Sequence, residues 1–206
     1  MENDRLREYK GKRDFSKTPE PAGERQGSGG SPVFVVQQHR ASTMHWDFRL
    51  EVDGVLVSWA VPKGPSTDPS QKRLAVRTED HPLDYARFEG VIPEDEYGGG
   101  AVIVWDYGTY ENHSRKDGRE LSMAEALEKG HVSVRLSGSK ISGGYSLIHA
   151  RLGGSEKNWL LVKERDDQAD ARRNPVSTEP ESVISGLAVE EMESRMSRHE
   201  SESDTE

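Results

Sequence analysis

The chain has 206 residues, of which 32% are hydrophobic and 32% charged, and its formal net charge is −9. This length suits one domain with tails, and the low apolar content predicts that part of the chain does not fold. The acidic balance argues against a protein that coats nucleic acid non-specifically. The absence of cysteine excludes disulfides, zinc fingers and thiol catalysis. No apolar run approaches the roughly 18 residues of a membrane span, and the charged N-terminus lacks a secretory h-region, so a cytoplasmic location is expected.

Composition divides the chain into three parts. Residues 1–31 are polar and end in a Gly/Ser-rich stretch, which is typical of a mobile arm followed by a flexible linker. Residues 32–164 hold nearly all the β-branched and aromatic periodicity and form the predicted folded domain. Residues 165–206 carry 5 basic against 12 acidic side chains and no aromatic residue, which predicts a disordered tail. Within that tail only residues 183–196 are a candidate for a short helix.

The central part is predicted to contain about eight short strands, because β-branched and aromatic runs alternate there with turn residues. The expected strands are residues 33–38, 45–52, 55–62, 73–77, 101–110, 131–136, 144–149 and 159–163. Asp53-Gly54 is a strong signal for a hairpin turn between the second and third of these. A capping box at Ser122 and Glu125, with Gly130 as the stop, predicts one short helix.

Many short strands with little helix predict a mainly β fold, in the form of a small β-barrel or sandwich with one or two short helices and disordered termini. Polar inward side chains in the lumen or mouth of a barrel are one place for a site. Trp59, Trp105 and Trp159 lie on strand patterns and are expected in the core. The acids at residues 94–96 precede a run of three glycines and are expected to form a solvated loop rather than a metal site.

The densest group of chemically versatile side chains lies in residues 37–50 and includes His39. Strand alternation places His45, Asp47 and Arg49 on one face of a strand, with apolar side chains on the other. Two imidazoles and one carboxylate suffice to hold Mn²⁺, Zn²⁺ or Fe²⁺ and leave positions open for substrate. The alternatives are a solvated strand face whose charges pair loosely, and the iron site of a non-haem oxygenase.

A cluster of cations and proton donors follows this group. Arg49, Lys63 and Arg73 supply positive charge, and His81 and Tyr85 are candidate proton donors or oxygen ligands. Fixed cations beside a divalent metal suit a phosphate ester better than an iron–oxygen intermediate. For any one of these cations, an ordinary surface position is the alternative.

The combined motifs resemble the 3′-phosphoesterase domain of bacterial DNA ligase D and its stand-alone bacterial and archaeal relatives. The matching segments are Gln-Gln-His39-x5-His45-Trp-Asp47-Phe-Arg49-Leu-Glu, Ser-Trp-Ala-Val-Pro-Lys63-Gly-Pro, Glu-Asp-His81-Pro-x2-Tyr85 and Phe88-Glu-Gly-x-Ile-Pro-x2-Glu-Tyr-Gly-Gly-Gly. An N-terminal segment, Tyr9-x2-Lys-Arg13-Asp14-Phe-x2-Thr-x-Glu20-Pro, resembles that family's mobile arm. The resemblance covers roughly residues 9–165.

This resemblance implies a metal-dependent enzyme, usually dependent on Mn²⁺, with Co²⁺ or Zn²⁺ as other candidate ions. Family members remove a 3′-terminal ribonucleotide from a DNA strand, leaving a 3′-phosphate, and then hydrolyse that phosphate to a 3′-OH for repair synthesis or ligation. By matching position, His39, His45 and Asp47 would hold the metal, while Arg49 and His81 would contact the scissile phosphate with Tyr85 nearby. The other positions that the family uses for activity match Arg13, Asp14, Glu20, Gln37, Lys63 and Arg73.

The implied substrates are DNA or primer–template 3′ ends that carry a ribonucleotide or a phosphate. The chain is too short for ligase and polymerase domains, so it is expected to be a stand-alone monomer. A separate DNA ligase, polymerase or end-binding protein of non-homologous end joining would be its partner, and no membrane is expected. A non-haem iron oxygenase and a non-catalytic DNA-end adaptor are the competing hypotheses. Most of the negative charge lies in residues 165–206, so the acidic total argues only against non-specific coating of duplex DNA.

Overall fold

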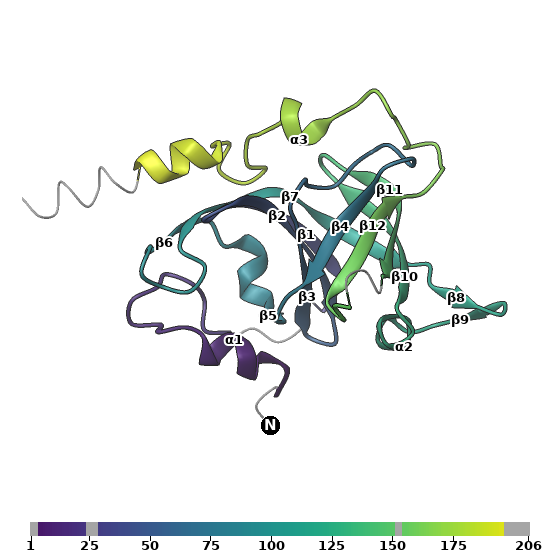
Figure 1. Ribbon diagram of the computed structural model, residues 1–206, viewed down its shortest axis with the longest axis horizontal. Coiled ribbons are helices and arrows are strands. Elements are labelled where there is room, and N and C mark those ends of the chain that lie inside the picture. Colours follow the sequence, from purple (N-terminus) through teal and green to yellow (C-terminus); the bar gives the residue numbers. More distant parts are fainter. Residues whose placement is uncertain (1–3, 24–28, 151–153, 196–206) are drawn as a thin grey trace, which may run out of the picture.

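The computed structural model describes residues 4–23, 29–150 and 154–195, which form a closed barrel of antiparallel strands with a few short helices (Figure 1). The strands of the barrel are β1 (Val33–Arg40), β2 (Met44–Val52), β3 (Val55–Val61), β4 (Lys72–Arg77), β7 (Gly100–Asn112), β10 (His131–Gly138), β11 (Ser142–His149) and β12 (Asn158–Lys163). Their order is β1-β2-β3-β4-β12-β11-β10-β7, and β7 closes the barrel by pairing with β1. This confirms the mainly β prediction, and each expected strand is present.

The inside of the barrel is filled by the apolar face of these strands. Phe48 and Trp59 are fully buried in one large cluster, and Trp105 and Trp159 lie in the same cluster, as expected for core residues. An eight-stranded barrel has an interior only wide enough for packed side chains. The packed interior of the described barrel therefore leaves no room for a site in the lumen, and the polar side chains of β1 and β2 point to the outer face.

Short elements cover this outer face. They are η1 (Asp4–Leu6), α1 (Arg7–Gly11), β5 (His81–Pro82), η2 (Leu83–Arg87) and β6 (Gly90–Ile92). A second apolar cluster joins them to the barrel, in which Tyr9 of α1 packs with Val35 of β1 and Leu83 of η2. The arm that composition predicted to be mobile is thus packed on the barrel over residues 4–23, because Tyr9 is fully buried and donates a hydrogen bond to the Pro21 carbonyl at 2.8 Å. Residues 24–28 of the expected linker lie outside the described residues.

Between β7 and β10 the chain forms a small substructure outside the barrel (Figure 1). It consists of the hairpin β8 (Arg115–Lys116) and β9 (Arg119–Glu120) and the helix α2 (Met123–Glu128). The predicted capping box is present, since the Ser122 hydroxyl accepts from the Glu125 amide while the Glu125 carboxylate accepts from the Ser122 amide. None of the helices in the described part of the chain is long and apolar enough to cross a bilayer.

The chain beyond residue 164 differs from the disordered tail that composition predicted. Residues 165–195, which include α3 (Pro175–Thr178), run along the barrel surface (Figure 1). The Glu179 carbonyl accepts hydrogen bonds at 2.8 Å from both the indole of Trp105 and the ammonium of Lys140. Composition did not predict this contact because a backbone carbonyl, which is present at every residue, is the acceptor for two buried donors.

An apolar contact holds the end of the same segment. Backbone over residues 189–195 is helical, and Val189 is 1% exposed in a cluster with Ala101 and Ile103 of β7. The candidate helix at 183–196 is therefore present in shortened form. Residues 196–206, the remainder of the expected tail, lie outside the described residues.

Candidate metal and phosphate site

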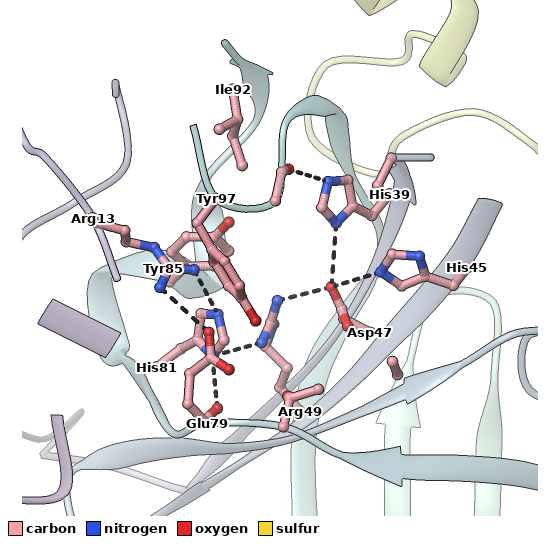
Figure 2. A pocket seen from close by; sticks show the side chains of 14 residues that line it. Arg13, His39, His45, Asp47, Arg49, Glu79, His81, Tyr85, Ile92 and Tyr97 are labelled. Atoms are coloured by element: carbon pink, nitrogen blue, oxygen red, sulfur yellow. Dashed lines mark hydrogen bonds and ion pairs between the residues drawn. The ribbon is translucent and has the colours of Figure 1, made fainter. Parts of the chain in front are cut away.

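Strand pairing gathers the polar side chains of β1, β2 and β3 on one patch of the outer face. The register sets His39 opposite His45, Gln37 opposite Asp47, and Arg49 opposite Ser58 of β3. A pocket of about 280 Å³ opens above this patch. Figure 2 shows the two histidines and Asp47 on one side of the pocket, and Arg49 and His81 on the other.

His39, His45 and Asp47 form a group with one ligand atom each, all within 4.8 Å of one another. The nearest nitrogens lie 3.9 Å (His39 Nδ1) and 3.7 Å (His45 Nε2) from Asp47 Oδ2, which is longer than a direct hydrogen bond. The second ring nitrogen of each histidine donates to a backbone carbonyl, His39 to Gly98 at 2.8 Å and His45 to Thr43 at 2.9 Å. Because a carbonyl can only accept, both tautomers are fixed with a lone pair facing Asp47. This outer-shell arrangement is typical of metal-binding histidines, so the residues fit a divalent cation.

A tight loop supplies the carbonyl that orients His39. Within residues 93–99, the Glu96 amide donates to the Pro93 carbonyl at 3.0 Å and the Gly99 amide to the Glu96 carbonyl at 3.1 Å. Gly100 follows with a φ of +133°, and a Cβ there would lie 2.0 Å from the Arg40 carbonyl oxygen. The glycine run therefore lets β7 approach the β1–β2 turn closely. The acids at 94 and 95 are exposed, and the described residues place neither in the metal-binding group.

Arg49 is 2% exposed and connects the histidine group to the rest of the pocket. Its Nη2 donates to Asp47 at 3.0 Å, its Nε to Gln37 at 2.8 Å and its Nη1 to the Ser58 hydroxyl at 2.9 Å. The Gln37 amide nitrogen in turn donates to the carbonyl of Tyr85 at 3.0 Å. The guanidinium is therefore held in one orientation beside the carboxylate that would bind the metal.

His81 forms the floor of the pocket and is almost fully buried. Its Nδ1 lies 2.9 Å from the Glu79 carbonyl and 2.9 Å from Arg49 Nη1, and its Nε2 lies 3.5 Å from Arg13 Nη2. Burial, together with the positive charges of Arg49 and Arg13, holds the pKa of His81 well below its usual value. The ring is therefore neutral near pH 7, and its Nδ1 lies between a carbonyl that can only accept a hydrogen bond and a guanidinium that can only donate one.

This lowered pKa predicts a pH-dependent stability. As pH falls through about 6.5, the unfolded chain takes up a proton at His81 that the folded protein does not, so the free energy of unfolding decreases by up to about 1.4 kcal/mol per pH unit. In a His81→Asn variant this contribution is absent. Urea unfolding without added metal, between about pH 7 and about pH 5, is expected to give a shallower pH slope for the variant than for the wild type. Parallel slopes would contradict the assignment.

The N-terminal arm closes one side of the pocket through a buried carboxylate. Glu20 Oε1 accepts from Arg13 Nε at 2.9 Å and from the Tyr85 hydroxyl at 3.0 Å. Arg13 also donates to Glu79 at 3.3 Å and lies over the ring of Tyr9 at 3.9 Å. Burial and the neighbouring Glu20 raise the pKa of Tyr85 well above its usual value, so its phenol keeps its proton. The arm thus contributes a cation to the pocket.

Three of the predicted site residues lie elsewhere. The side chain of Asp14 is 51% exposed and bonds Ser16 on the outside of the arm. Lys63, which follows β3, and Arg73, near the start of β4, line a second depression of about 430 Å³. Their short distance from the histidines in sequence suggested one shared site. The two residues lie at ends of β3 and β4 that are away from the face on which the histidines lie.

The separate location of Lys63 and Arg73 predicts an effect on DNA affinity rather than on the chemical step. Lys63→Ala and Arg73→Gln are each expected to raise KM for a primer–template several-fold, to change kcat by less than about twofold, and to lower the salt dependence of binding by about one phosphate contact. Steady-state kinetics at several salt concentrations would measure this. Lys116→Ala, an exposed lysine on the β8–β9 hairpin, is the matched control. A fall in kcat at unchanged KM would contradict the prediction.

Sequence reasoning missed three residues that line or support the pocket: Ser58, Glu79 and Tyr97. The position of Ser58 could have been predicted from the sequence, because a two-residue turn at Asp53-Gly54 fixes a register that sets Ser58 opposite Arg49. Glu79 and Tyr97 had none beyond their places in the quoted motifs, since their positions depend on the arm and on the loop before β7.

Comparisons with known proteins show which family the chain belongs to. Residues 37–149 match the family described as the DNA Ligase D 3′-phosphoesterase domain. The chain is 52% identical over 184 residues to a multifunctional non-homologous end joining protein LigD from Pseudomonas aeruginosa, covering 87% of this chain and 21% of that protein. It is 48% identical over 168 residues to the LigD repair protein of Mycobacterium tuberculosis (80% and 21% covered), and 43% identical over 188 residues to that of Mycolicibacterium smegmatis (91% and 23%). The chain therefore spans little more than a fifth of the length of these relatives.

Proposed function

Because this chain belongs to the family of DNA ligase D 3′-phosphoesterase domains, we propose that it is a metal-dependent phosphoesterase that processes DNA 3′ ends. The observation that carries the proposal is the group of His39, His45 and Asp47 joined through Arg49 to His81 in one pocket. The relatives are named as proteins of non-homologous end joining, which supports a DNA end as the substrate. The reaction would remove a 3′-terminal ribonucleotide and then a 3′-phosphate, leaving a 3′-OH for a separate polymerase or ligase.

The metal would be held by His39 Nδ1, His45 Nε2 and Asp47 Oδ2, the three atoms whose lone pairs converge. When bound, a divalent ion such as Mn²⁺ supplies a Lewis acid that stabilises negative charge on a phosphate oxygen. Co²⁺ or Zn²⁺ suits the same nitrogen and oxygen donors. The fixed tautomers of both histidines mean that the protein needs no rearrangement to present these donors.

Arg49 would orient the phosphate and offset the charge that develops on it. Its guanidinium is held by Asp47, Gln37 and Ser58 before any substrate arrives, so little reorganisation energy is needed. Arg13 adds a second cation on the other side of His81. Two fixed guanidinium groups around one pocket offer directed donors that suit the oxygens of a phosphate ester.

His81 would move a proton at Nε2. With a proton on Nδ1, shared with the Glu79 carbonyl at 2.9 Å, Nε2 would face Arg13 with its lone pair. A phosphate bound between the two arginines would offset their charge and raise the pKa of His81. Nε2 is then the atom that takes up a proton and can pass it to a leaving oxygen.

The test is an end-processing assay with purified protein. With Mn²⁺, a primer–template that ends in a 3′-phosphate is expected to be converted to a 3′-OH, and one that ends in a ribonucleotide to be shortened. If folded protein leaves both ends intact with Mn²⁺, Co²⁺ and Zn²⁺, the proposal is wrong. Oxygen uptake with Fe²⁺ and a 2-oxo acid would favour the oxygenase, and tight end binding without turnover would favour the adaptor.

A further inference from the structure

Tyr97 is an aromatic side chain that the core does not explain. It is 49% exposed and is one of four exposed large hydrophobic residues in the described ranges. It lies in the loop before β7 and lines the same pocket as Arg49 and His81. In Figure 2 its ring extends from the loop into the pocket toward these two residues.

The ring is held in place before any ligand binds. Lys12 Nζ donates to its hydroxyl at 3.3 Å and lies 4.7 Å from the ring centre, and Arg13 Cζ lies 5.4 Å from the same centre. The next residue, Gly98, provides the carbonyl that orients His39. The loop therefore couples an exposed aromatic ring to the metal-binding group, and stacking on this ring would cost little conformational entropy.

The ring is also close to where a phosphate would bind. Arg13 contacts the Tyr97 ring on one side and approaches His81 Nε2 at 3.5 Å on the other. One residue thus separates the ring from the proposed phosphate position, which is within the reach of a single nucleotide. An aromatic face beside a phosphate site is the arrangement that binds single-stranded nucleic acid without sequence preference, because every base has a π-face.

We propose that Tyr97 is the stacking platform for the base of the nucleotide that carries the 3′-phosphate. The inference rests on the proposed function and deepens it, since it identifies how the strand end is positioned. Binding through the base face, with no hydrogen-bond reading of its edge, suits an enzyme that must accept any terminal base. The strand end would be held at two points, the phosphate by the two arginines and the base by Tyr97.

The experiment removes the base and the ring separately and together. Tyr97→Ala is expected to raise KM for a 3′-phosphate oligonucleotide about tenfold or more. The same variant should change KM less than twofold on an oligonucleotide whose 3′-phosphate unit is abasic, because no base remains to stack. Tyr97→Phe keeps the ring and its cation–ring contacts and loses only the hydrogen bond from Lys12, and it should behave as the wild type on both substrates.

Equal losses on both substrates would overturn the proposal, because they would show that Tyr97 only supports the arm through Lys12. A second readout does not require turnover: an oligonucleotide with 2-aminopurine at the 3′-phosphate unit should lose fluorescence on binding wild type and Tyr97→Phe, and lose much less on binding Tyr97→Ala. Absence of turnover with normal quenching would reject the proposed activity alone. Turnover with equal quenching by all three proteins would reject the stacking role alone.

Discussion

Replacing His45 with alanine is expected to abolish metal-dependent removal of a 3′-phosphate while leaving the barrel folded. Loss of a mere outer-shell partner lowers metal affinity or activity by roughly 10–100-fold, and His45 presents its own Nε2 to the metal position, so a loss above about 100-fold is expected. The side chain is 21% exposed and its hydrogen bond is to the nearby Thr43 carbonyl, so little packing is removed. Phosphate release and Mn²⁺ binding by calorimetry would measure the two effects.

The matched control for this variant is His113→Ala. His113 is also a strand-end histidine paired with a carboxylate, Glu111, but it is 50% exposed and does not line the pocket. Its replacement should leave metal binding and kcat unchanged. Full activity in the His45→Ala variant would show that the proposed metal centre has no part in the mechanism, whatever the result for the control.

Replacing Arg49 with lysine is expected to lower kcat by about 10²–10³-fold, the range seen when one fixed donor to a developing negative charge is lost. Lysine keeps the positive charge near Asp47 but cannot also reach Gln37 and Ser58 with a rigid fork. A phosphate would then meet a mobile point charge. Arg49→Ala is a poorer test, because it leaves the buried carboxylate of Asp47 without its cation and is expected to cost about 3–5 kcal/mol of stability.

For Arg49→Lys the free energy of unfolding must be measured together with kcat. The Gln37 and Ser58 groups that lose their partner are buried, so the free energy of unfolding is expected to fall by about 1–3 kcal/mol. Arg77→Lys provides the control. Arg77 also makes several hydrogen bonds, to the Ser58 and Thr78 carbonyls and to Asp80, yet it does not line the pocket. Comparable losses of stability with a selective loss of kcat at position 49 are the expected result. Equal kcat losses in both variants would assign the effect to stability alone.

The local sequence pattern was sufficient to predict the strands and the part of the site that β1 and β2 carry. The alternation of His45, Asp47 and Arg49 and the Asp53-Gly54 turn already placed these side chains on one face, and the structure has them there. His39 joined them because a short turn between β1 and β2 sets it directly opposite His45. These placements depend on period and turn geometry, which are written in neighbouring residues.

Contacts between distant segments could not be predicted in the same way. The N-terminal arm was expected to be mobile, and only the family resemblance gave Arg13 and Glu20 a role. In the structure Tyr9 is buried and Arg13 reaches the pocket, where Glu20 and Glu79 pair with its charge. Lys63 and Arg73 were expected beside the metal group, yet they line another depression.

The acidic composition argues against one class of function, the non-specific coating of nucleic acid, and it gives no positive assignment. By itself the sequence determined the strand order along the chain, the candidate His/His/Asp metal group as a set of residue types, and the family resemblance, since all three are recorded in local spacing. Only the tertiary structure decided that the barrel lumen is closed, that His81 is neutral between two arginines, and that residues 165–195 lie on the barrel. The physical reason is that burial and charge pairing depend on residues far apart in the chain, whose proximity no local pattern specifies.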